Sequence, residues 1–449
     1  MFPNGLVAAM EEIENGVPVT DNQVAEEAVV VADESAEIQQ TEDEVGTSVS
    51  QIEAAVQDGE ELESIAEVAS DAVESGEGLT KESAELASIA IESIRRRVGI
   101  HSGTRAVPAT ESFGNSNTRL TSTKMIVEAI SFDIKKIWAA IKAAFIRVVD
   151  KIRGFLSSLF KSTSMLNNYI KSLIKRAESV STSAVKKEEE LNVGLLTKNF
   201  TVNGKANLAT SREIVKNTLS LAGVSTLIAA SARNVGSEAV KLANNLSPEG
   251  IKAFLKVEEK ESMNIVTAAK AFSAISGAGI GGAKMPDVED TYGPFINGKV
   301  ILKKFEDKKI LGTDIRVYSI KFENTSAPAA KSITALSLSE IKETLKMALE
   351  LAKGAETFKK DEAAYADIAK QVSKLSDTII SHAEKISDKD DEATKSSLKE
   401  LKSFVNDTMK TVGSFGQIAP AATFQCARAL ADYASASLRN LGEKTVEKK

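Results

Sequence analysis

Cysteine, histidine, proline and aromatic residues are all scarce in this chain, and each scarcity narrows what the protein can be. The one cysteine, Cys426, has no partner for an internal disulfide bond, so nothing indicates an oxidising compartment. It lies in an apolar helical pattern, which predicts a buried and unreactive thiol. The two histidines, His101 and His382, have no metal-ligand spacing around them. We therefore predict no metal, no cofactor and no enzymatic activity.

Aromatic residues make up only 5% of the 449 residues, and there are 8 prolines. Alanine, serine, lysine and glutamate dominate instead, and this composition favours helices over sheets. The N-terminus lacks the basic and apolar parts of a secretory signal, and no uncharged apolar run reaches the roughly 18 residues of a membrane-spanning helix. The sequence thus predicts a helical protein that is synthesised in a cytoplasm.

Basic residues are absent from the first 80 positions, whereas the rest of the chain has an excess of them. Residues 1–111 contain 25 acidic and 5 basic residues, a net charge of −20. The remaining residues contain 38 acidic and 51 basic ones, a net charge of +13. The overall charge of −7 therefore averages two regions of opposite character. Such an asymmetry is typical of an acidic tail or prosegment joined to a body that binds polyanions.

The acidic region contains no aromatic residue between Pro3 and Ser112. High net charge with few aromatics describes a segment that cannot bury enough surface to fold independently. We therefore expect residues 1–111 to be largely disordered, with local helix at 51–73 and 81–98. A linker rich in glycine, proline, serine and asparagine begins at His101, and the main boundary of the chain is expected there.

From Thr123 onward the pattern is that of a long helix. Apolar residues recur at steps of three and four, among them Ile126, Ile130, Ile134, Trp138 and Phe145. Basic residues occupy most of the remaining positions, which predicts a long amphipathic basic helix. Gly154 and Ser157-Ser158 are expected to bend or break it. A second basic helix is expected at about 164–187, so that the two form either a hairpin or one interrupted rod.

The rest of the chain is predicted to be helical apart from one insertion. Lys299–Phe305 and Asp314–Phe322 alternate and are rich in β-branched and aromatic residues, so they predict a hairpin. The predicted fold is mainly α, with helical bundles, a long amphipathic basic helix, a small β-hairpin insertion and a largely disordered acidic N-terminal region. Its expected parts are an acidic region (1–111), a basic amphipathic helical segment (112–190), a helical domain (191–285), a loop and β-hairpin (286–330) and a C-terminal helical bundle (331–449).

The run Gly277-x-Gly279-x-x-Gly282 matches the dinucleotide-binding fingerprint in its letters only. That fingerprint needs a strand before the glycines and a helix after them. Here the pattern predicts a helix (260–276) before the run and a proline-containing loop after it. A linker that ends a helix is the better interpretation, in line with the absence of a predicted cofactor.

Ala109-Thr110-Glu111, followed by Ser112, fits a small-residue-x-Glu pattern at the point where acidic sequence gives way to basic sequence. The same pattern occurs ten times up to Glu111 and five times after it. An exposed linker rich in proline, glycine and serine is a favourable place for proteolysis. We therefore predict cleavage after Glu111, with the earlier matches left as alternatives.

The basic helix has three interpretations. Its apolar stripe can pack into the protein's own core, which is the commonest outcome for such a stripe. Its basic face can neutralise nucleic-acid phosphates, since residues 112–176 carry 12 basic and 3 acidic side chains. Its apolar face can instead insert into a membrane surface. The side chains proposed for nucleic-acid or membrane contact are Lys135, Lys136, Lys142, Arg147, Lys151, Arg153 and Lys161.

Two stretches, Ser83–Val98 and Pro108–Gly114, together with the helix Phe132–Lys161, resemble the internal head (capsid-internal) proteins of large tailed bacteriophages. The resemblance covers about the first third of the chain. It implies an acidic propeptide that the phage prohead protease removes at small-x-Glu sites during head maturation. It also implies a location inside the capsid after synthesis in the host cytoplasm.

The resemblance gives the charge asymmetry a function. Removal of residues 1–111 would leave a basic product that associates non-specifically with packaged DNA or is ejected with it. The implied partners are the prohead protease, packaged DNA, and capsid or scaffold proteins. Two alternatives stay open: a membrane-active effector that uses residues 132–161 against lipid, and a purely structural head or tail component.

Overall fold

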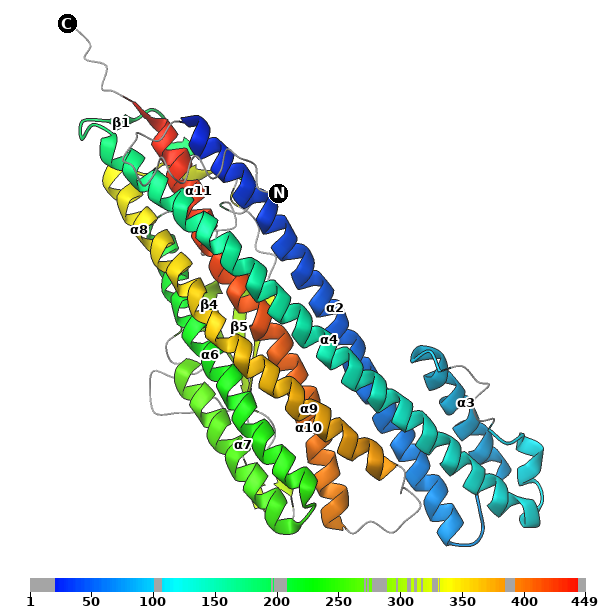
Figure 1. Cartoon of the computed structure of the whole chain (residues 1–449). Helices are drawn as coiled ribbons and strands as arrows, with labels where there is room; N and C mark the ends of the chain where they lie inside the picture. The colour runs from blue at the N-terminus through cyan, green and yellow to red at the C-terminus, as the bar shows by residue number, and fades with distance from the viewer. Residues whose placement is uncertain are drawn as a thin grey trace, which may run out of the picture.

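The computed structural model describes residues 21–100, 107–194, 197, 208–269, 272, 274–276, 289–295, 298–304, 308–310, 313–315, 318–324, 330, 332–383 and 392–442. Long helices run side by side along one axis, with a small sheet beside them (Figure 1). The mainly α fold predicted from composition is confirmed. The helices are α2 (Asp21–Glu74), α3 (Lys81–Arg97), α4 (Ser116–Ser179), α6 (Leu208–Asn244), α7 (Pro248–Ala269), α8 (Leu338–Ala355), α9 (Asp361–Ala383), α10 (Glu392–Gly413) and α11 (Ala419–Asn440).

The long amphipathic basic helix is present as α4, which extends over 64 residues. The predicted interruption at Gly154 and Ser157-Ser158 does not occur, and the helix expected at 164–187 is the continuation of α4 up to Ser179. Apolar side chains keep their helical spacing on both sides of Gly154, and those at Ile152, Phe155 and Leu156 are buried. Burial of that stripe outweighs the cost of about 1 kcal/mol for a glycine inside a helix.

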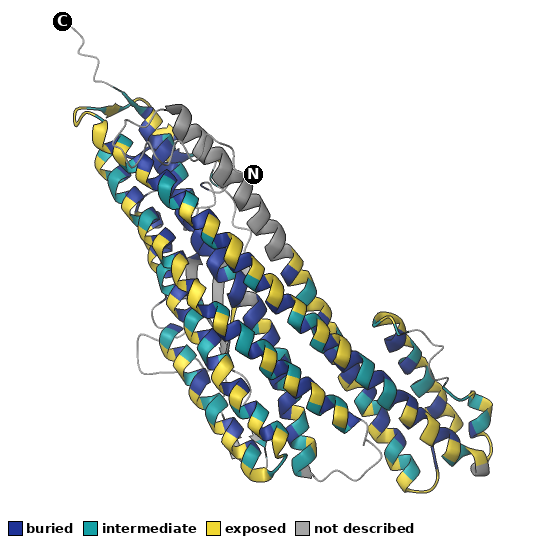
Figure 2. Ribbon diagram, in the orientation of Figure 1, coloured by how far each residue is buried: buried dark blue, intermediate teal, exposed yellow. Residues whose placement is uncertain are grey.

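The described part of the acidic region, residues 21–100 and 107–111, is more ordered than its composition predicts, because it has a partner. Helix α2 lies along α4 for much of its length, and α3 lies beside the end of this pair (Figure 1). A set of small or aliphatic side chains of α2 is buried in the hydrophobic core, and the ribbon of this helix includes buried positions along its coloured part (Figure 2). They are Val45, Ile52, Val56, Leu62, Ala66 and Ala69. The segment lacks a core of its own and uses the apolar face of α4 instead.

The centre of the molecule is α11. Most of its side chains are buried, including Phe424, Leu430 and Tyr433, so it is covered on nearly all sides. It packs on α8, α4 and α6, and α9 fills the space between α4 and α6. A single hydrophobic cluster takes side chains from all of these helices and from α2 and α3. A short π-helix, η3 (Ser414–Ile418), connects α10 to α11.

The insertion is larger than a hairpin. The predicted strands pair as β5 (Gly298–Lys304) and β8 (Tyr318–Asn324), with Val300 opposite Phe322, so the hairpin is confirmed. Two further strands, β4 (Glu289–Phe295) and β3 (Ala274–Ser276), extend it to the antiparallel order β3-β4-β5-β8.

The end of α7 also differs from the sequence prediction. The helix stops at Ala269 and β3 begins at Ala274, so the helix predicted up to residue 276 is too long. The aromatic rings of Phe272, Tyr292, Phe295 and Phe322 pack together at this point. Helical spacing in the sequence does not reveal this cluster, since its members come from separate segments. The glycine run at 277–282 lies outside the described residues.

The remaining strands are short. A hairpin joins β6 (Lys308–Ile310) to β7 (Thr313–Ile315). Two two-residue ladders tie the chain segment after α4 to distant parts of the chain, where β1 (Val185–Lys186) pairs with β10 (Leu441–Gly442) and β2 (Glu190–Leu191) with β9 (Ile333–Thr334). They close the end of the bundle at which α4 ends.

Asp361, the first residue of α9, carries a buried carboxyl group whose ionisation opposes folding. Its side chain is 2% exposed, and Thr226 Oγ1 donates a hydrogen bond to it at 3.3 Å. Burial raises the pKa of Asp361 to about 6, against the opposing effect of that hydrogen bond. A carboxyl group with a raised pKa contributes stability at low pH and loses this contribution as the pH rises through about 6.

We therefore expect Asp361→Asn to stabilise the protein by up to about 2 kcal/mol at neutral pH and above, and by almost nothing near pH 4. Thermal unfolding of both proteins across this pH range would measure the difference. A melting-temperature difference that is independent of pH would contradict the burial of an ionised Asp361.

Candidate processing site and cationic helix

The predicted cleavage site lies in a short 3-10 turn, η1 (Thr110–Phe113), just before α4. Ala109 and Glu111 are exposed, and Thr110 and Ser112 are partly buried. Within the turn the Ser112 backbone N–H donates to the Ala109 carbonyl at 2.9 Å, and the Gly114 N–H donates to the Glu111 carbonyl at 3.2 Å. The acidic side chain is thus accessible, but the peptide bond that follows it belongs to a closed turn.

The residues after Glu111 are packed against the start of α4. Phe113 is 1% exposed, and Arg119 Nε donates to the Phe113 carbonyl at 3.1 Å. Thr118 Oγ1 donates to the Ser112 carbonyl at 2.6 Å. A protease that binds its substrate in an extended form requires this turn to open first, so local opening controls cleavage in the folded protein.

An earlier match to the same pattern, Ser75-Gly76-Glu77, lies in the exposed turn between α2 and α3. Gly76 and Gly78 both have positive φ values, of 78° and 68°, which is the conformation that glycine adopts without strain. Gly78 is buried, and a Cβ atom there would lie 3.0 Å from the backbone of Arg119. In both candidate sites an exposed glutamate is therefore followed by residues packed against the start of α4.

Phe113→Ala should speed up cleavage after Glu111. Removing the buried ring weakens the anchor of the turn, and a loss of about 2 kcal/mol in the opening free energy corresponds to a rate roughly 30-fold higher. The measurement is the rate at which a glutamate-specific endopeptidase cuts there, followed by mass spectrometry. Leu86→Ala, at a side chain 70% exposed, is the control and should change nothing. Equal rates in all three proteins would show that the turn does not limit cleavage.

The seven cations proposed for nucleic-acid or membrane contact all lie on α4, but several of them are paired. Lys142 Nζ lies 2.7 Å from Asp377 Oδ1 of α9, and Lys151 Nζ lies 3.0 Å from Glu44 Oε2 of α2. Arg153 contacts Glu362 at 3.4 Å and Asp150 at 3.8 Å. Carboxylates from two neighbouring helices thus neutralise cations that the sequence pattern presents as one basic face.

The other four proposed contact residues have varied surroundings. Lys136 Nζ lies 4.6 Å from the centre of the Phe132 ring, and Arg147 Nε donates to the Ala143 carbonyl at 3.3 Å. Lys135 is half-buried, whereas Lys161 is exposed. Of these four residues, Arg147 and Lys161 are the exposed ones.

The apolar face of α4 packs into the protein's own core, as the commonest interpretation of such a stripe predicts. Ile134, Ile137, Trp138, Ile141 and Phe145 are each at most 1% exposed. Contact with lipid would require α4 to leave α2, α9 and α11. By length and composition alone, one described helix, Ser211–Asn244, could cross a membrane, although 61% of its most apolar window is buried, as in a core helix.

A buried ion pair joins the acidic region to the rest of the protein (residues 112–449, the body). Arg95 Nε donates to Asp133 Oδ2 of α4 at 2.7 Å, and the two side chains are 2% and 0% exposed. Arg95 Nη1 also lies 3.0 Å from Glu92 Oε1. Burial raises the pKa of Asp133, while the hydrogen bond and charge of Arg95 lower it, and burial dominates. Sequence reasoning missed this pair, because its two members lie 38 residues apart in the chain.

Arg97 extends the same contact on the surface. Its guanidinium donates to Asp58 Oδ1 at 2.6 Å and 2.9 Å, and to Glu61 Oε2 at 3.1 Å. The hydrogen bond to Asp58 raises the pKa of Arg97 further above its already high value. Two arginines at the end of α3 thus connect it to two helices, with Arg95 directed at α4 and Arg97 at α2.

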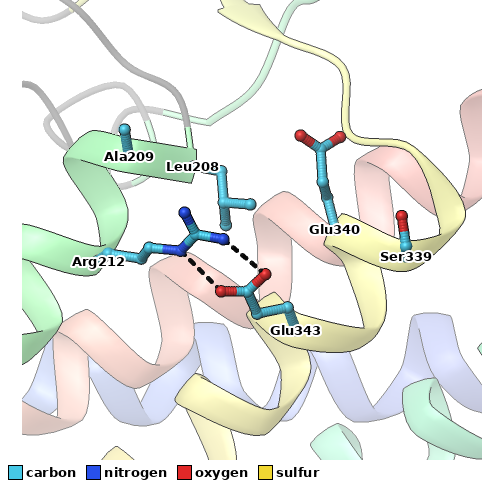
Figure 3. A pocket seen from close by; sticks show the side chains of 6 residues that line it. All are labelled: Leu208, Ala209, Arg212, Ser339, Glu340 and Glu343. Atoms are coloured by element: carbon cyan, nitrogen blue, oxygen red, sulfur yellow. Dashed lines mark hydrogen bonds and ion pairs between the residues drawn. The ribbon is translucent and has the colours of Figure 1, made fainter.

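One described pocket, of about 420 Å³, lies where α6 and α8 begin. Figure 3 shows its Arg212 directed at Glu343, with Nε and Nη2 lying 2.7 and 2.8 Å from the two carboxylate oxygens. Burial alone would raise the pKa of Glu340, but hydrogen bonds from Ser337 outweigh it and lower that pKa. The cation of the pocket is already neutralised, and its carboxylates are ionised, so the pocket is unsuited to an anion.

Cys426 and His382, whose residue types often act as nucleophiles or metal ligands, have no such role in the described structure. Cys426 is fully buried, and burial raises the pKa of its thiol to about 12, so the thiol is protonated at neutral pH. This confirms the predicted burial. His382 is half-buried on α9, and His101 lies outside the described residues. Within the described part of the chain, no group of three His, Cys, Asp or Glu side chains could hold a metal ion.

The fold and its contacts define a structural class of protein, an elongated helical bundle in which an acidic helix, α2, packs along a long basic helix, α4. The chain belongs to the phiKZ-like phage internal head proteins, whose family model matches residues 24–438. The match begins within α2 and ends within α11, so it includes the acidic helix as well as the body. Members of this family lie inside the phage head. No curated protein and no solved structure matches the chain.

Proposed function

We propose that this protein is packaged inside the phage head with its acidic region in place and is then processed, with cleavage after Glu111, to a basic product that associates with packaged DNA. The family supports the location. The opposite charges of the two regions support the order of events, since a chain with a net charge of −7 gives way to a product with a net charge of +13. Coulomb attraction then favours the product, and not the precursor, on DNA.

The observation that carries this proposal is the pairing of carboxylates in α2 with lysines of the body. Glu44 pairs with Lys151 of α4, and Glu63 pairs with Lys402 of α10. In the unprocessed chain these two lysines are partly neutralised. Removal of the acidic region frees both lysines, whose charges are part of the +13 of the product, and this strengthens attraction to phosphate groups.

The closed turn at Glu111 suggests when processing takes place. A bond held in a turn, with Phe113 buried behind it, is cut slowly in the folded protein. The phage prohead protease would therefore act on chains in which the turn is open. Arrival of DNA or rearrangement of the head could provide this opening, as could incomplete folding of the newly made chain.

The test is the intact mass and N-terminal sequence of the protein taken from mature particles. We expect a chain that begins at Ser112, whose affinity for duplex DNA falls steeply with salt concentration and shows no sequence preference. A particle-derived chain that begins at Met1 would contradict processing. A chain that begins at Ser112 but binds DNA equally well at low and high salt would contradict the electrostatic role.

A further inference from the structure

The face of the body that α2 covers has the features of a docking groove. It is formed by α4 together with the end of α10, η3 and α11, all of which contact α2. With Val49 and Gly59 included, the α2 positions on this face (Val45, Val49, Ile52, Val56, Gly59 and Leu62) recur at steps of three and four residues, as in one face of an amphipathic helix. Val45, Ile52, Val56 and Leu62 are each at most 3% exposed.

Two glycines, one on α2 and one on α10, allow the two surfaces to approach closely. Gly59 of α2 faces α4, where a Cβ atom would lie 3.5 Å from Ile137 Cγ2 and 3.8 Å from Trp138 Nε1. Gly413 of the body faces α2, where a Cβ atom would lie 2.5 Å from Val49 Cγ2. A side chain of the opposite partner thus occupies the space that each glycine leaves.

The charges of the two partners are also complementary. Lys151 and Lys402 flank the groove and pair with Glu44 and Glu63 of α2. The Lys151–Glu44 pair is substantially exposed, at 42% and 51%, so it orients the helix more than it stabilises the contact. Most of the stability comes from the buried aliphatic side chains. The buried pair between Arg95 of α3 and Asp133 of α4 fixes the position of α3.

None of these contacts depends on the chain link between α3 and α4. We propose that the body carries a docking groove for an acidic amphipathic helix, and that α2 and α3 (residues 21–97, the N-terminal cap) stay in it after the backbone is cut. The processed protein is then first a two-chain complex, and departure of the cap is a separate step that uncovers the groove and its lysines. This inference rests on the proposed function only for the natural cut after Glu111.

The test uses the full chain with the recognition sequence of a site-specific protease inserted after Gly103. After complete cutting, size-exclusion chromatography in native buffer should recover both fragments in one peak, and the same sample should separate in denaturant. Trp138, the only tryptophan, is 1% exposed at the groove, so its emission should not change on cutting. A cap fragment that elutes alone, with a red shift of the Trp138 emission, would overturn the inference.

Two valines of α2 provide a matched pair of variants. Val56 is 2% exposed and faces the groove, whereas Val68 is 59% exposed. In the cut protein Val56→Asp should weaken retention of the cap roughly 100-fold, because the carboxylate loses its water, and Val68→Asp should retain it like the parent. Equal retention of the two variants would overturn the inference.

Gly413→Ala changes the groove itself and leaves the cap unaltered. It is the variant to use if the Val56→Asp protein does not fold. The three heavy atoms nearest to its added methyl group all belong to Val49, so it should weaken retention about 10-fold. Gly154→Ala on α4, where a Cβ atom would meet nothing within 4 Å, is the control. Unchanged retention in Gly413→Ala would count against the groove.

The docking groove and the proposed function can fail independently, and the experiments tell the two failures apart. Particle-derived protein that begins at Met1 would contradict natural processing and leave the behaviour of the cut chain unaffected. A cap that dissociates on cutting would contradict the groove and leave natural processing unaffected. Peaks of twice the expected mass, with caps exchanged between copies, would overturn docking within one chain.

Discussion

Replacing Arg95 with methionine is expected to destabilise the protein by about 3–5 kcal/mol at neutral pH. The substitution keeps much of the aliphatic volume and removes the partner of Asp133, whose side chain is fully buried. Asp133 Oδ1 already has no hydrogen-bond partner among the described residues, so the loss of Arg95 leaves a buried carboxylate without a compensating charge. Denaturant unfolding followed by circular dichroism measures the effect.

The penalty should depend on pH in a defined direction. Burial raises the pKa of Asp133 above its ordinary value, so the stability that this carboxyl group contributes is present at low pH and is lost as the pH rises through its folded-state pKa. Without Arg95 that pKa rises further. The difference between the variant and the parent should therefore be largest near pH 7 and shrink as the pH falls toward about 4.

A double substitution distinguishes the effect of the uncompensated charge from the effect of lost packing. Arg95→Met combined with Asp133→Leu removes both charges and should recover most of the lost stability, because a well-packed apolar pair can replace a buried ion pair. If the single and double variants are equally unstable, the loss comes from packing and not from the uncompensated charge. The result also reports on the cap, since Arg95 is its buried anchor on α4.

Replacing Trp138 with alanine is expected to cost about 3–5 kcal/mol, the range for deletion of a large buried aromatic side chain. Trp138 is 1% exposed on α4 and lies opposite Gly59 of α2. The cavity would open between α2 and α4, where neither long helix can collapse into it without losing its other contacts. Unfolding followed by far-ultraviolet circular dichroism gives the measurement, since the variant lacks the fluorescent side chain.

The indole N–H of Trp138 makes Trp138→Phe the informative control. Trp138 Nε1 is buried and has no hydrogen-bond partner among the described residues. Phenylalanine keeps most of the ring volume and removes this unpaired donor, so we expect a loss of less than about 1.5 kcal/mol. A loss in Trp138→Phe as large as that in Trp138→Ala would mean that the N–H group has an unseen partner.

Several features of the fold could be predicted because they follow from local spacing. The apolar residues of α4 recur every three or four positions over the whole helix, and burial of that stripe is the commonest outcome for such a pattern. The pairing of β5 with β8 followed from alternation and β-branched residues. Burial of Cys426 followed from its apolar helical context.

Other features involve contacts between segments that lie far apart in the chain. Arg95 and Asp133 are unremarkable in sequence, and only the packing of α3 on α4 makes them a buried pair. The basic residues of α4 form one face in the helical pattern, yet Asp377 and Glu44 reach them from α9 and α2. No local pattern contains these partners.

The sequence by itself determined the helical class, the division of charge and the position of the small-x-Glu match at the boundary, because composition and spacing are properties of the chain alone. Only the tertiary structure decided that residues 21–97 of the acidic region form two helices, the longer of which packs on α4. Its charge and lack of aromatics indicate disorder for an isolated segment, and the apolar face of α4 supplies the burial that it lacks. Order in this region is a property of the pair, since neither partner alone buries that surface.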